Sequence, residues 1–377
     1  MVLFLHNRYR TTGGEERVVE DLLWLVRERL GEPAQLLTRD SARLGAGQAA
    51  LGLLRGGLAP ADVTRAVRLT GARVVHAHNL QPALGWRALA AARAAGARVV
   101  VHLHQYRLVC AIGVCFTRGA QCTRCHGTNT LPGVRLNCRA SRPEALAYAA
   151  SLALWQRRMV ELADAVIVPS EFARERLREL GAPLDWQRVH VLPPPLRTTS
   201  LPCADPSSGT YALVASRLSP EKGVDVAIDA CRRAGLGLVV AGDGPQRAAL
   251  QERAAGADVR FVGRVDDEEL SRLRAGAAIA LAPSLAAETF GLAAAEALAV
   301  ALPVAASRVG ALTELVEREG LVAPGDADAL AGAVARLAGD RAAGERGRER
   351  VRQLCAPATV AGALAQIYDG RDRRGAA

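Results

Sequence analysis

The sequence predicts an α/β protein with two doubly wound domains that face a central cleft. Short apolar runs alternate with longer amphipathic stretches along most of the 377 residues, a pattern typical of parallel sheets covered by helices on both faces. The alternation stops near residue 193, in a segment rich in Pro, Ser and Thr, and then starts again. A chain of this length also exceeds what one hydrophobic core usually supports. These observations favour two domains joined by a linker.

The first domain is predicted over residues 1–197. Its apolar runs indicate strands at 2–6, 35–38, 74–78, 98–104, 165–169 and 189–192. Its amphipathic stretches indicate helices at 15–29, 83–95, 142–162 and 171–180. Residues 110–138 break the alternation with glycines and five cysteines, which predicts an insert with a structure of its own.

The linker is predicted at residues 198–208 and the second domain at residues 209–355. Strands are expected at 211–217, 236–241, 259–262, 279–282 and 303–306, and helices at 223–234, 246–254, 268–275, 292–300 and 327–337. The last segment, residues 356–377, contains an amphipathic stretch up to residue 368. We expect that stretch to return to the first domain as a helix.

The most informative stretch lies between Glu288 and Glu296, two carboxylates in an otherwise apolar run. Glu288 is expected on a loop from strand to helix, with Glu296 facing inward from the helix that starts at Leu292. The free amides near Phe290 and Gly291 open that helix and form a seat for an anionic or hydroxyl-rich ligand. A helix cap at Glu288 and a solvated Glu296 are the alternative, but an unpaired buried carboxylate is costly.

Two cations follow the first strand of the second domain. Arg217 and Lys222 flank a turn with Pro220 and Gly223, and Lys222 is the one lysine beside 47 arginines. In doubly wound sheets, ligands bind outside the carboxyl ends of the strands, so these cations are placed to hold a diphosphate. The alternative is a surface loop in which Glu221 pairs with Arg217.

Weaker signals lie at other strand ends. Gly13 and Gly14 precede a helix whose amides suit phosphate binding, whereas Gly242 begins a tight turn that says little alone. His104 ends a strand in which His102 shares its face. We weigh a cleft position for His104 against a structural role.

The cysteine insert predicts a metal site. Cys122 and Cys125 have knuckle spacing, and with Cys110 and Cys138 they supply the four thiolates of a closed structural zinc site. The insert has little apolar content, so a metal would replace a core. Cys115 or His126 are stand-ins, and a redox role for the Cys122 and Cys125 pair, or unligated thiols, remain open.

Charge is concentrated in the first half of the chain, where residues 1–200 hold 27 basic and 15 acidic side chains. A solvated surface explains this balance, and so does an acidic partner such as an anionic phospholipid face. Scattered arginines with few aromatics argue against nucleic acid. The first apolar run is too short for a signal segment, and the sequence lacks an uncharged run of about 20 residues. We therefore expect a cytoplasmic protein, peripheral to the inner membrane face if it meets lipid.

These motifs together resemble the family 4 retaining glycosyltransferases. The resemblance rests on Arg217-Leu-Ser-Pro-Glu-Lys-Gly223, Gly242-Asp-Gly-Pro245, the stretch from Glu288 to Glu296, and Pro303-Val304. It covers nearly the whole chain and implies the GT-B fold of two facing Rossmann-like domains. It also implies transfer of a sugar from a nucleotide-diphosphate donor to an acceptor hydroxyl, with retention and without a catalytic metal. A UDP-sugar is favoured over a GDP-sugar, and the acceptor is a glycan, a lipid-linked molecule or a small molecule.

The resemblance also assigns roles to individual residues. Arg217 and Lys222 would hold the diphosphate, Glu288 would orient the donor sugar and Glu296 would bind the ribose. On the donor side, Gly14 matches the glycine that approaches the diphosphate, and Gly242 matches the family's turn. The amides near Phe290, Gly291 and Leu292 would also bind the donor. His104 matches the histidine beside the donor sugar. A subgroup of the family carries cysteines matching Cys110, Cys122, Cys125 and Cys138.

Two departures and three rival functions accompany this interpretation. Gln105 stands where the family usually has Asp, and Ala311 where it has Gly; the first puts acceptor chemistry in doubt. A glycoside hydrolase uses two carboxylates without needing the cations, and a phosphorylase of the same fold would use Lys222 as an aldimine. A zinc-containing interaction protein without enzymatic activity is the third alternative.

Overall fold

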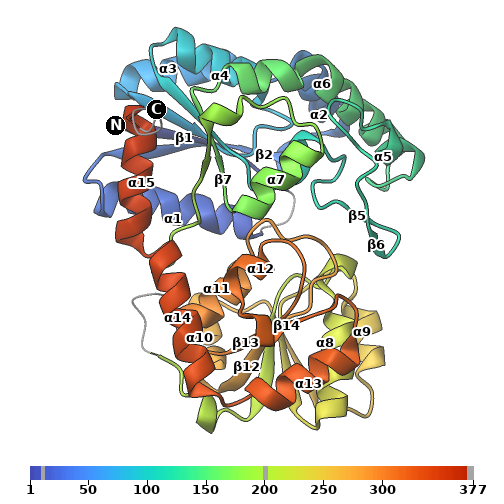
Figure 1. The fold of residues 1–377 in the computed structure, drawn as a ribbon. Coiled ribbons are helices and arrows are strands. Elements are labelled where there is room, and N and C mark those ends of the chain that lie inside the picture. The colour runs from blue at the N-terminus through green and yellow to red at the C-terminus, as the bar shows by residue number, and fades with distance from the viewer. Residues whose placement is uncertain (10–12, 198–202, 372–377) are drawn as a thin grey trace. The chain divides into compact units, whose positions relative to one another are not determined.

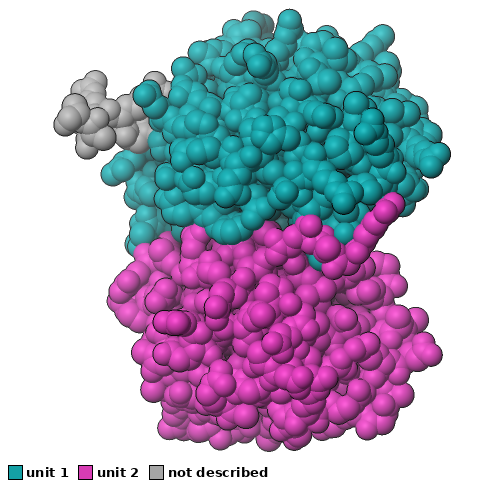
Figure 2. Space-filling view, turned by 45° about the vertical axis from the view of Figure 1, so that its right-hand side comes forward, with its two compact units in different colours: residues 1–117, 122–195, 357–377 teal, residues 118–121, 196–356 magenta. Residues whose placement is uncertain are grey.

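A computed structural model of the chain describes residues 1–9, 13–197 and 203–371. The contacts divide the chain into two compact units, which Figure 2 shows in different colours. Unit 1 comprises residues 1–117, 122–195 and 357–377, and unit 2 comprises residues 118–121 and 196–356. Part of the predicted linker, residues 198–202, and the end of the predicted C-terminal segment, residues 372–377, lie outside the described residues.

Unit 1 is built on a parallel sheet of six strands in the order β2-β1-β3-β4-β7-β8. The central strands consist mostly of valine, isoleucine and leucine and are buried on both faces, as a parallel sheet requires. The strands of this sheet are β1 (Val2–Arg8), β2 (Ala34–Asp40), β3 (Val74–Ala77), β4 (Arg98–His102), β7 (Ala165–Val168) and β8 (Val189–Val191). A separate two-stranded sheet consists of β5 (Phe116–Thr117) and β6 (Ala120–Gln121).

Eight helices among the described residues accompany the unit 1 sheet. They are α1 (Gly14–Glu28), α2 (Ala46–Arg55), α3 (Pro60–Thr70), α4 (Gly85–Ala94), α5 (Leu131–Arg135), α6 (Arg142–Glu161), α7 (Glu171–Glu179) and α15 (Pro357–Asp369), labelled in Figure 1. The sequence did not predict α2, α3 or the short α5. Glycines interrupt the apolar pattern of α2, and at Gly52 a Cβ atom would lie 2.5 Å from the Pro82 carbonyl oxygen. Gly52, which interrupts the helical pattern of apolar residues, is therefore needed for the close approach of α2 to the Pro82 backbone.

The two faces of the unit 1 sheet differ in character. Leu3 and Leu5 of β1 belong to the apolar core shared with α3 and α4. The alternate residues of β1 face the other way, where the Phe4 ring lies 5.2 Å from the His76 ring. On that second face the His76 ring contacts Tyr368 of α15. Burial on this face thus includes several histidines as well as apolar groups.

The helix α15 packs with unit 1, although it follows unit 2 in the sequence. Arg98 Nε donates to the Ile367 carbonyl oxygen at 3.1 Å, and Arg73 pairs with Asp369 at 3.1 Å. Tyr368 is almost fully buried. These contacts fix the last described helix to β3 and β4.

Unit 2 contains a second parallel sheet of six strands in the order β11-β10-β9-β12-β13-β14. Small and branched apolar residues fill these strands, which suits a sheet with both faces covered. The strands are β9 (Tyr211–Ala215), β10 (Gly237–Ala241), β11 (Val259–Gly263), β12 (Ala277–Ala282), β13 (Val304–Ser307) and β14 (Leu321–Val322).

Seven helices among the described residues belong to unit 2, and the sequence did not predict the long helix α14 or the short α12. They are α8 (Val224–Ala234), α9 (Arg247–Arg253), α10 (Asp267–Ala275), α11 (Leu292–Ala299), α12 (Leu312–Leu315), α13 (Ala327–Leu337) and α14 (Arg341–Cys355). The buried face of α14 consists of Gly344, Gly347, Val351 and Cys355. A Cβ at Gly344 would lie 2.0 Å from the Ala301 carbonyl oxygen. Because the buried face of α14 consists mostly of small residues, its sequence lacks the periodic large apolar residues that usually indicate a helix.

The predicted fold class is confirmed by these two sheets, each parallel and flanked by helices (Figure 1). Most predicted strands and helices lie within a few residues of their observed bounds. Within the described residues no helix is long and apolar enough to cross a membrane.

Candidate functional site

The loop that carries Lys222 lies against the loop that carries Ser284. Residues Pro220–Lys222 form a short 3-10 helix that ends at Gly223, whose φ is 62°. A Cβ at Gly223 would lie 2.1 Å from the Pro283 carbonyl oxygen, so the left-handed glycine allows this close approach. The Leu285 amide donates to the Glu221 carbonyl oxygen at 2.8 Å, which fixes the two loops together.

This approach brings Lys222 into contact with Glu288. Lys222 Nζ lies 2.6 Å from Glu288 Oε1, and Ser284 Oγ donates to the same oxygen at 2.6 Å. The two charged side chains are about a quarter and a fifth exposed. Burial acts to raise the pKa of Glu288, but the Lys222 charge and the two hydrogen bonds outweigh it and leave the pKa below its ordinary value. Glu288 is therefore a carboxylate at neutral pH, paired with Lys222 and mostly buried.

Glycine at position 310 supports the backbone of Glu288. A Cβ at Gly310 would lie 2.4 Å from the Glu288 nitrogen, and the Ala311 amide donates to the Glu288 carbonyl oxygen at 2.9 Å. The loop after β13 is thus fitted to the loop after β12. The carboxylate that faces Lys222 is held by two neighbouring strand ends.

Arg217 lies on the same loop as Lys222 but is paired differently. Its Nη2 lies 2.5 Å from Glu221 Oε1, and its Nε donates to Ser219 Oγ at 3.2 Å. Half of the Arg217 side chain is exposed. The ion pair with Glu221 that the sequence offered as an alternative is therefore present. It keeps Arg217 at the surface of this loop, where an exposed pair is worth little and an anion can compete for it.

Glu296 is buried in α11 and is paired with Arg274. Both side chains are less than a tenth exposed, and Arg274 Nη2 donates to Glu296 Oε2. Arg274 lies in the last turn of α10, and sequence reasoning missed it because the local pattern does not distinguish it from the exposed Arg272 on the same helix. The partner that an inward-facing Glu296 needs is thus supplied by the protein.

The first turn of α11 begins at Gly291, whose φ of 97° is left-handed and which has no side-chain cap. Phe290 before it is buried, and a Cβ at Gly291 would lie 2.7 Å from a Leu312 methyl group. The amides of Gly291 and Leu292 therefore open the helix immediately after Glu288. This arrangement suits an anion or a hydroxyl group.

The turn at Gly242 packs against the Arg217 loop. Gly242 has a φ of 139°, and a Cβ there would lie 1.9 Å from the Ser216 carbonyl oxygen. The Leu218 amide donates to the Asp243 carbonyl oxygen at 3.0 Å. Gly242 thus shapes the backbone behind the cations.

In unit 1, Gly14 is the first residue of α1. The Gly13 amide at the start of this helix donates to Glu16 Oε2 at 2.8 Å, so one amide that the sequence offered to a phosphate is already used. Glu15 is buried and accepts from the Tyr9 hydroxyl at 2.7 Å and from Gln105 Nε2 at 3.4 Å. Gln105, which replaces the expected Asp, thus acts as a donor to a carboxylate.

His104 lies two residues beyond β4, in contact with other histidines. Its Nε2 lies 2.8 Å from His78 Nδ1, and its ring stacks on His102 at 4.2 Å. Burial, followed by the neighbouring His102 and His6, lowers the pKa of His104 well below its ordinary value. The side chain is therefore a neutral imidazole at neutral pH. The sequence indicated the contact with His102 but not the one with His78.

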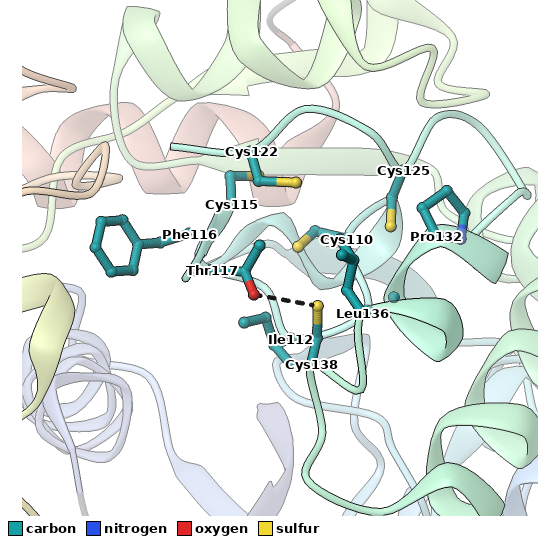
Figure 3. A pocket seen from close by; sticks show the side chains of 12 residues that line it. Cys110, Ile112, Cys115, Phe116, Thr117, Cys122, Cys125, Pro132, Leu136 and Cys138 are labelled. Carbon is teal, nitrogen blue, oxygen red and sulfur yellow. Dashed lines mark hydrogen bonds between the residues drawn. The ribbon is translucent and has the colours of Figure 1, made fainter. Parts of the chain in front are cut away.

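The five cysteines of the insert surround one small hollow, shown in Figure 3. Cys110, Cys115 and Cys125 are buried, and all eight cysteines of the chain are free thiols. A hydrogen bond from Cys115 lowers the pKa of Cys110 to about 6, while that bond and burial raise the pKa of Cys115. The stand-in His126 is not among the lining residues, since its ring lies beside Gly181. The four predicted ligands and Cys115 therefore all line the same hollow.

Comparison with known families assigns the chain. Residues 8–195 match the family described as "Glycosyl transferase 4-like domain", and residues 209–340 match "Glycosyl transferases group 1". The chain belongs to the group 1 glycosyltransferases. The first match covers most of unit 1 and the second covers the Arg217, Lys222 and Glu288 loops of unit 2.

Solved structures of other proteins match this chain over nearly its whole length. A sucrose-phosphate synthase from Thermosynechococcus elongatus has a TM-score of 0.71 at 21% identity and covers 98% of this chain and 99% of its own. HepE of Anabaena, in complex with UDP-glucose, has a TM-score of 0.66 at 19% identity and covers 98% of this chain and 100% of its own. At these identities the likeness shows the fold, which is GT-B.

A curated relative from Mycobacterium tuberculosis is named GDP-mannose-dependent alpha-(1-6)-phosphatidylinositol dimannoside mannosyltransferase. It is 38% identical to this chain over 188 residues, which are 45% of this chain and 48% of the relative. The chain therefore spans about half the length of the curated relatives that it matches first.

Proposed function

We propose that the protein transfers a glycosyl group from a nucleotide-diphosphate sugar to an acceptor hydroxyl with retention of the anomeric configuration. The observation that carries this proposal is the contact between Lys222 and Glu288, with Arg217 on the same loop. A cation that can bind the departing diphosphate lies beside a carboxylate that can accept a hydrogen bond from a sugar hydroxyl. The chain also belongs to a glycosyltransferase family. Family membership and this geometry support the same chemistry.

Charge on the departing diphosphate would be stabilised by protein groups without a catalytic metal. Lys222 and Arg217 supply the positive charge, and each would exchange a carboxylate partner for phosphate oxygens when the donor binds. The amides of Gly291 and Leu292 add donors that need no reorganisation. Phe290 and Gly242 hold the backbone that presents these groups. In unit 1, Gly14 would approach the diphosphate.

The sugar and the ribose would be recognised by the two glutamates. Glu288 is a carboxylate that keeps its Ser284 hydrogen bond when Lys222 turns to the diphosphate, so it can accept from hydroxyl groups of the donor sugar. Glu296, held by Arg274, would bind the ribose hydroxyls. His104 is neutral and would lie beside the donor sugar as a hydrogen-bonding group. Attack from the face of the leaving group lets a phosphate oxygen take the acceptor proton, so retention needs no separate base.

A UDP-sugar is the favoured donor and a GDP-sugar the alternative. HepE binds UDP-glucose and the mycobacterial relative is named for GDP-mannose. The acceptor would be a glycan, a lipid-linked molecule or a small molecule.

Donor binding is expected to raise the melting temperature of the protein. A ligand at 100 times its Kd stabilises the folded state by about 2.7 kcal/mol, which corresponds to several degrees for a unit of this size. A panel of UDP- and GDP-sugars should thus contain at least one that shifts melting, while the matching free sugar does not. Equal melting with every nucleotide sugar contradicts the proposed donor class, and free sugar released without nucleotide indicates a hydrolase.

We also propose a structural zinc ion held by Cys110, Cys122, Cys125 and Cys138. These thiols line one hollow, and the lowered pKa of Cys110 favours a thiolate, the form that binds metal. Cys115 lines the same hollow and is the alternative ligand. Among the described residues, no group of three cysteine sulfurs has all its members within 4.8 Å of one another. The side chains would therefore rotate inward to reach Zn–S distances of about 2.3 Å.

Protein purified without added metal is expected to contain one zinc ion held by thiolates. Cys125→Ser should lose this zinc and melt at a lower temperature, because the insert would lose its cross-link. Cys203→Ser, at an exposed position outside the hollow, is the matched control and should keep the zinc. Zinc content and thiol titration measure both. Metal-free protein with five reactive insert thiols contradicts the assignment, and an oxidised Cys122 and Cys125 pair favours the redox alternative.

A further inference from the structure

Five of the seven histidines of the chain gather on one face of the unit 1 sheet. We call them the histidine row: His6 of β1, His76 of β3, His78 just after β3, His102 of β4, and His104 beyond β4. The register pairs Phe4 with His76 and His76 with Val100, which places His78 beside His102. Neighbouring rings stack, with centroids 5.4 Å apart for His78 and His102. Parallel strands thus bring residues from separate motifs into one cluster.

Three members of the histidine row each have one ring nitrogen without a partner. Within the described residues, His76 Nε2, His78 Nε2 and His102 Nδ1 are buried and make no hydrogen bond. The three side chains are at most 3% exposed. Buried polar atoms are normally satisfied, and each exception asks for an explanation. His6 is a fourth exception, but in the described part of the chain only the other three belong to a group whose ring nitrogens lie within 4.8 Å of one another, so these three indicate a shared ligand.

We propose that His76, His78 and His102 form a binding site for a divalent late transition metal ion such as Zn²⁺. One ring nitrogen of each lies within 4.8 Å of one from each of the others. Neutral imidazole is a ligand of choice for zinc, nickel and copper ions. Nitrogens around one ion lie closer than this, so the rings would close inward on binding. This site is separate from the cysteine hollow and does not depend on the proposed function.

The opposite ring nitrogens of His76 and His78 already have the partners that metal-bound histidines require. His76 Nδ1 lies 2.7 Å from the Tyr368 hydroxyl, and His78 Nδ1 lies 2.8 Å from His104 Nε2. Such outer contacts fix the tautomer and orientation of a ligand. A metal on His78 Nε2 leaves Nδ1 as an N–H donor to His104. The ion would thereby orient His104 and link β3 and β4 to α15 through Tyr368.

Glu15 and Glu16 of α1 face His6, which lies next to His78, and their oxygens lie 3.9 and 3.7 Å from the His6 ring. These carboxylates add negative charge near the site.

Cobalt titration of the reduced, metal-free, tag-free protein tests the proposal. Co²⁺ bound to thiolates shows a strong charge-transfer band in the near ultraviolet, whereas Co²⁺ bound only by nitrogen and oxygen shows weaker visible bands alone. We expect one equivalent without the charge-transfer band, whether or not the cysteines bind another. His78→Gln should remove this equivalent and leave any thiolate signal unchanged. The measurement needs no enzymatic activity.

His6→Gln is the matched control, since His6 is buried in the same row but lies outside the triad. It should retain the nitrogen-bound equivalent. The proposal is overturned if wild-type protein shows no such equivalent or if His78→Gln keeps it. Should His78→Gln fail to fold, X-ray absorption of the wild-type cobalt protein decides: an ion with nitrogen neighbours alone supports the site, and sulfur around every bound ion overturns it.

Discussion

Lys222→Ala is expected to lower kcat for glycosyl transfer by roughly 10²- to 10³-fold, the scale of losing one positioned donor to developing negative charge. Lys222 is within 2.6 Å of Glu288, so the substitution removes the ammonium group and leaves that carboxylate without its charged partner. The leaving diphosphate would then face negative charge without compensation. Steady-state kinetics with saturating donor measures the effect.

Two variants separate this effect from a general loss of charge or stability. Arg233→Ala removes an exposed cation from the last turn of α8, the helix that begins after Gly223, and should leave kcat unchanged. Lys222→Arg keeps the charge but not the compact ammonium, so partial activity is expected. Near-wild-type turnover by a folded Lys222→Ala protein would remove Lys222 from the chemistry.

Arg274→Ala is expected to destabilise the protein by about 3–5 kcal/mol, because it strands the buried Glu296 carboxylate without its counter-charge. Both side chains of this pair are less than a tenth exposed. Melting of unit 2, followed by differential scanning calorimetry, should fall accordingly. Arg272→Ala, on the exposed side of the same helix, is the control and should change stability by less than about 0.5 kcal/mol.

The double variant Arg274→Met with Glu296→Leu distinguishes stability from function. Replacing a buried ion pair by apolar groups of similar size is often neutral or stabilising, so folding should recover. Donor binding should not recover, because the proposed contact of Glu296 with the ribose is gone. If Arg274→Ala melts at the same temperature as the wild type, the buried Arg274–Glu296 ion pair does not stabilise unit 2 as proposed. Full donor affinity in the double variant would exclude Glu296 from the donor site.

Local patterns were sufficient for the sheets and for the strand ends that carry the site. The strand ends that carry Lys222 and Glu288 were predicted, and parallel topology brings the carboxyl ends of neighbouring strands to one edge. Gly223 and Gly310 then allow the loops to approach each other so closely that Lys222 Nζ lies 2.6 Å from Glu288 Oε1. The sequence indicated that both groups point toward a ligand, but not that they pair with each other.

Contacts between distant segments could not be predicted from local pattern. Arg274 is one of two arginines on α10, and only its ion pair with Glu296 of α11 separates it from the exposed Arg272. The helix α14 was missed because Gly344 and Gly347 form its buried face, where close approach takes the place of apolar bulk. The histidine row also needs the strand register, since His76 and His102 are far apart in sequence.

The most direct test of the proposed transferase is release of nucleoside diphosphate from a panel of UDP- and GDP-sugars with mixed hydroxyl acceptors. The wild-type protein and Arg233→Ala should release UDP or GDP from at least one donor, with one sugar transferred per diphosphate. Lys222→Ala should reduce that release by roughly 10²-fold. If no nucleotide sugar is consumed by the wild type, or if Lys222→Ala releases diphosphate at the wild-type rate, the account of a Lys222 and Glu288 donor site is contradicted.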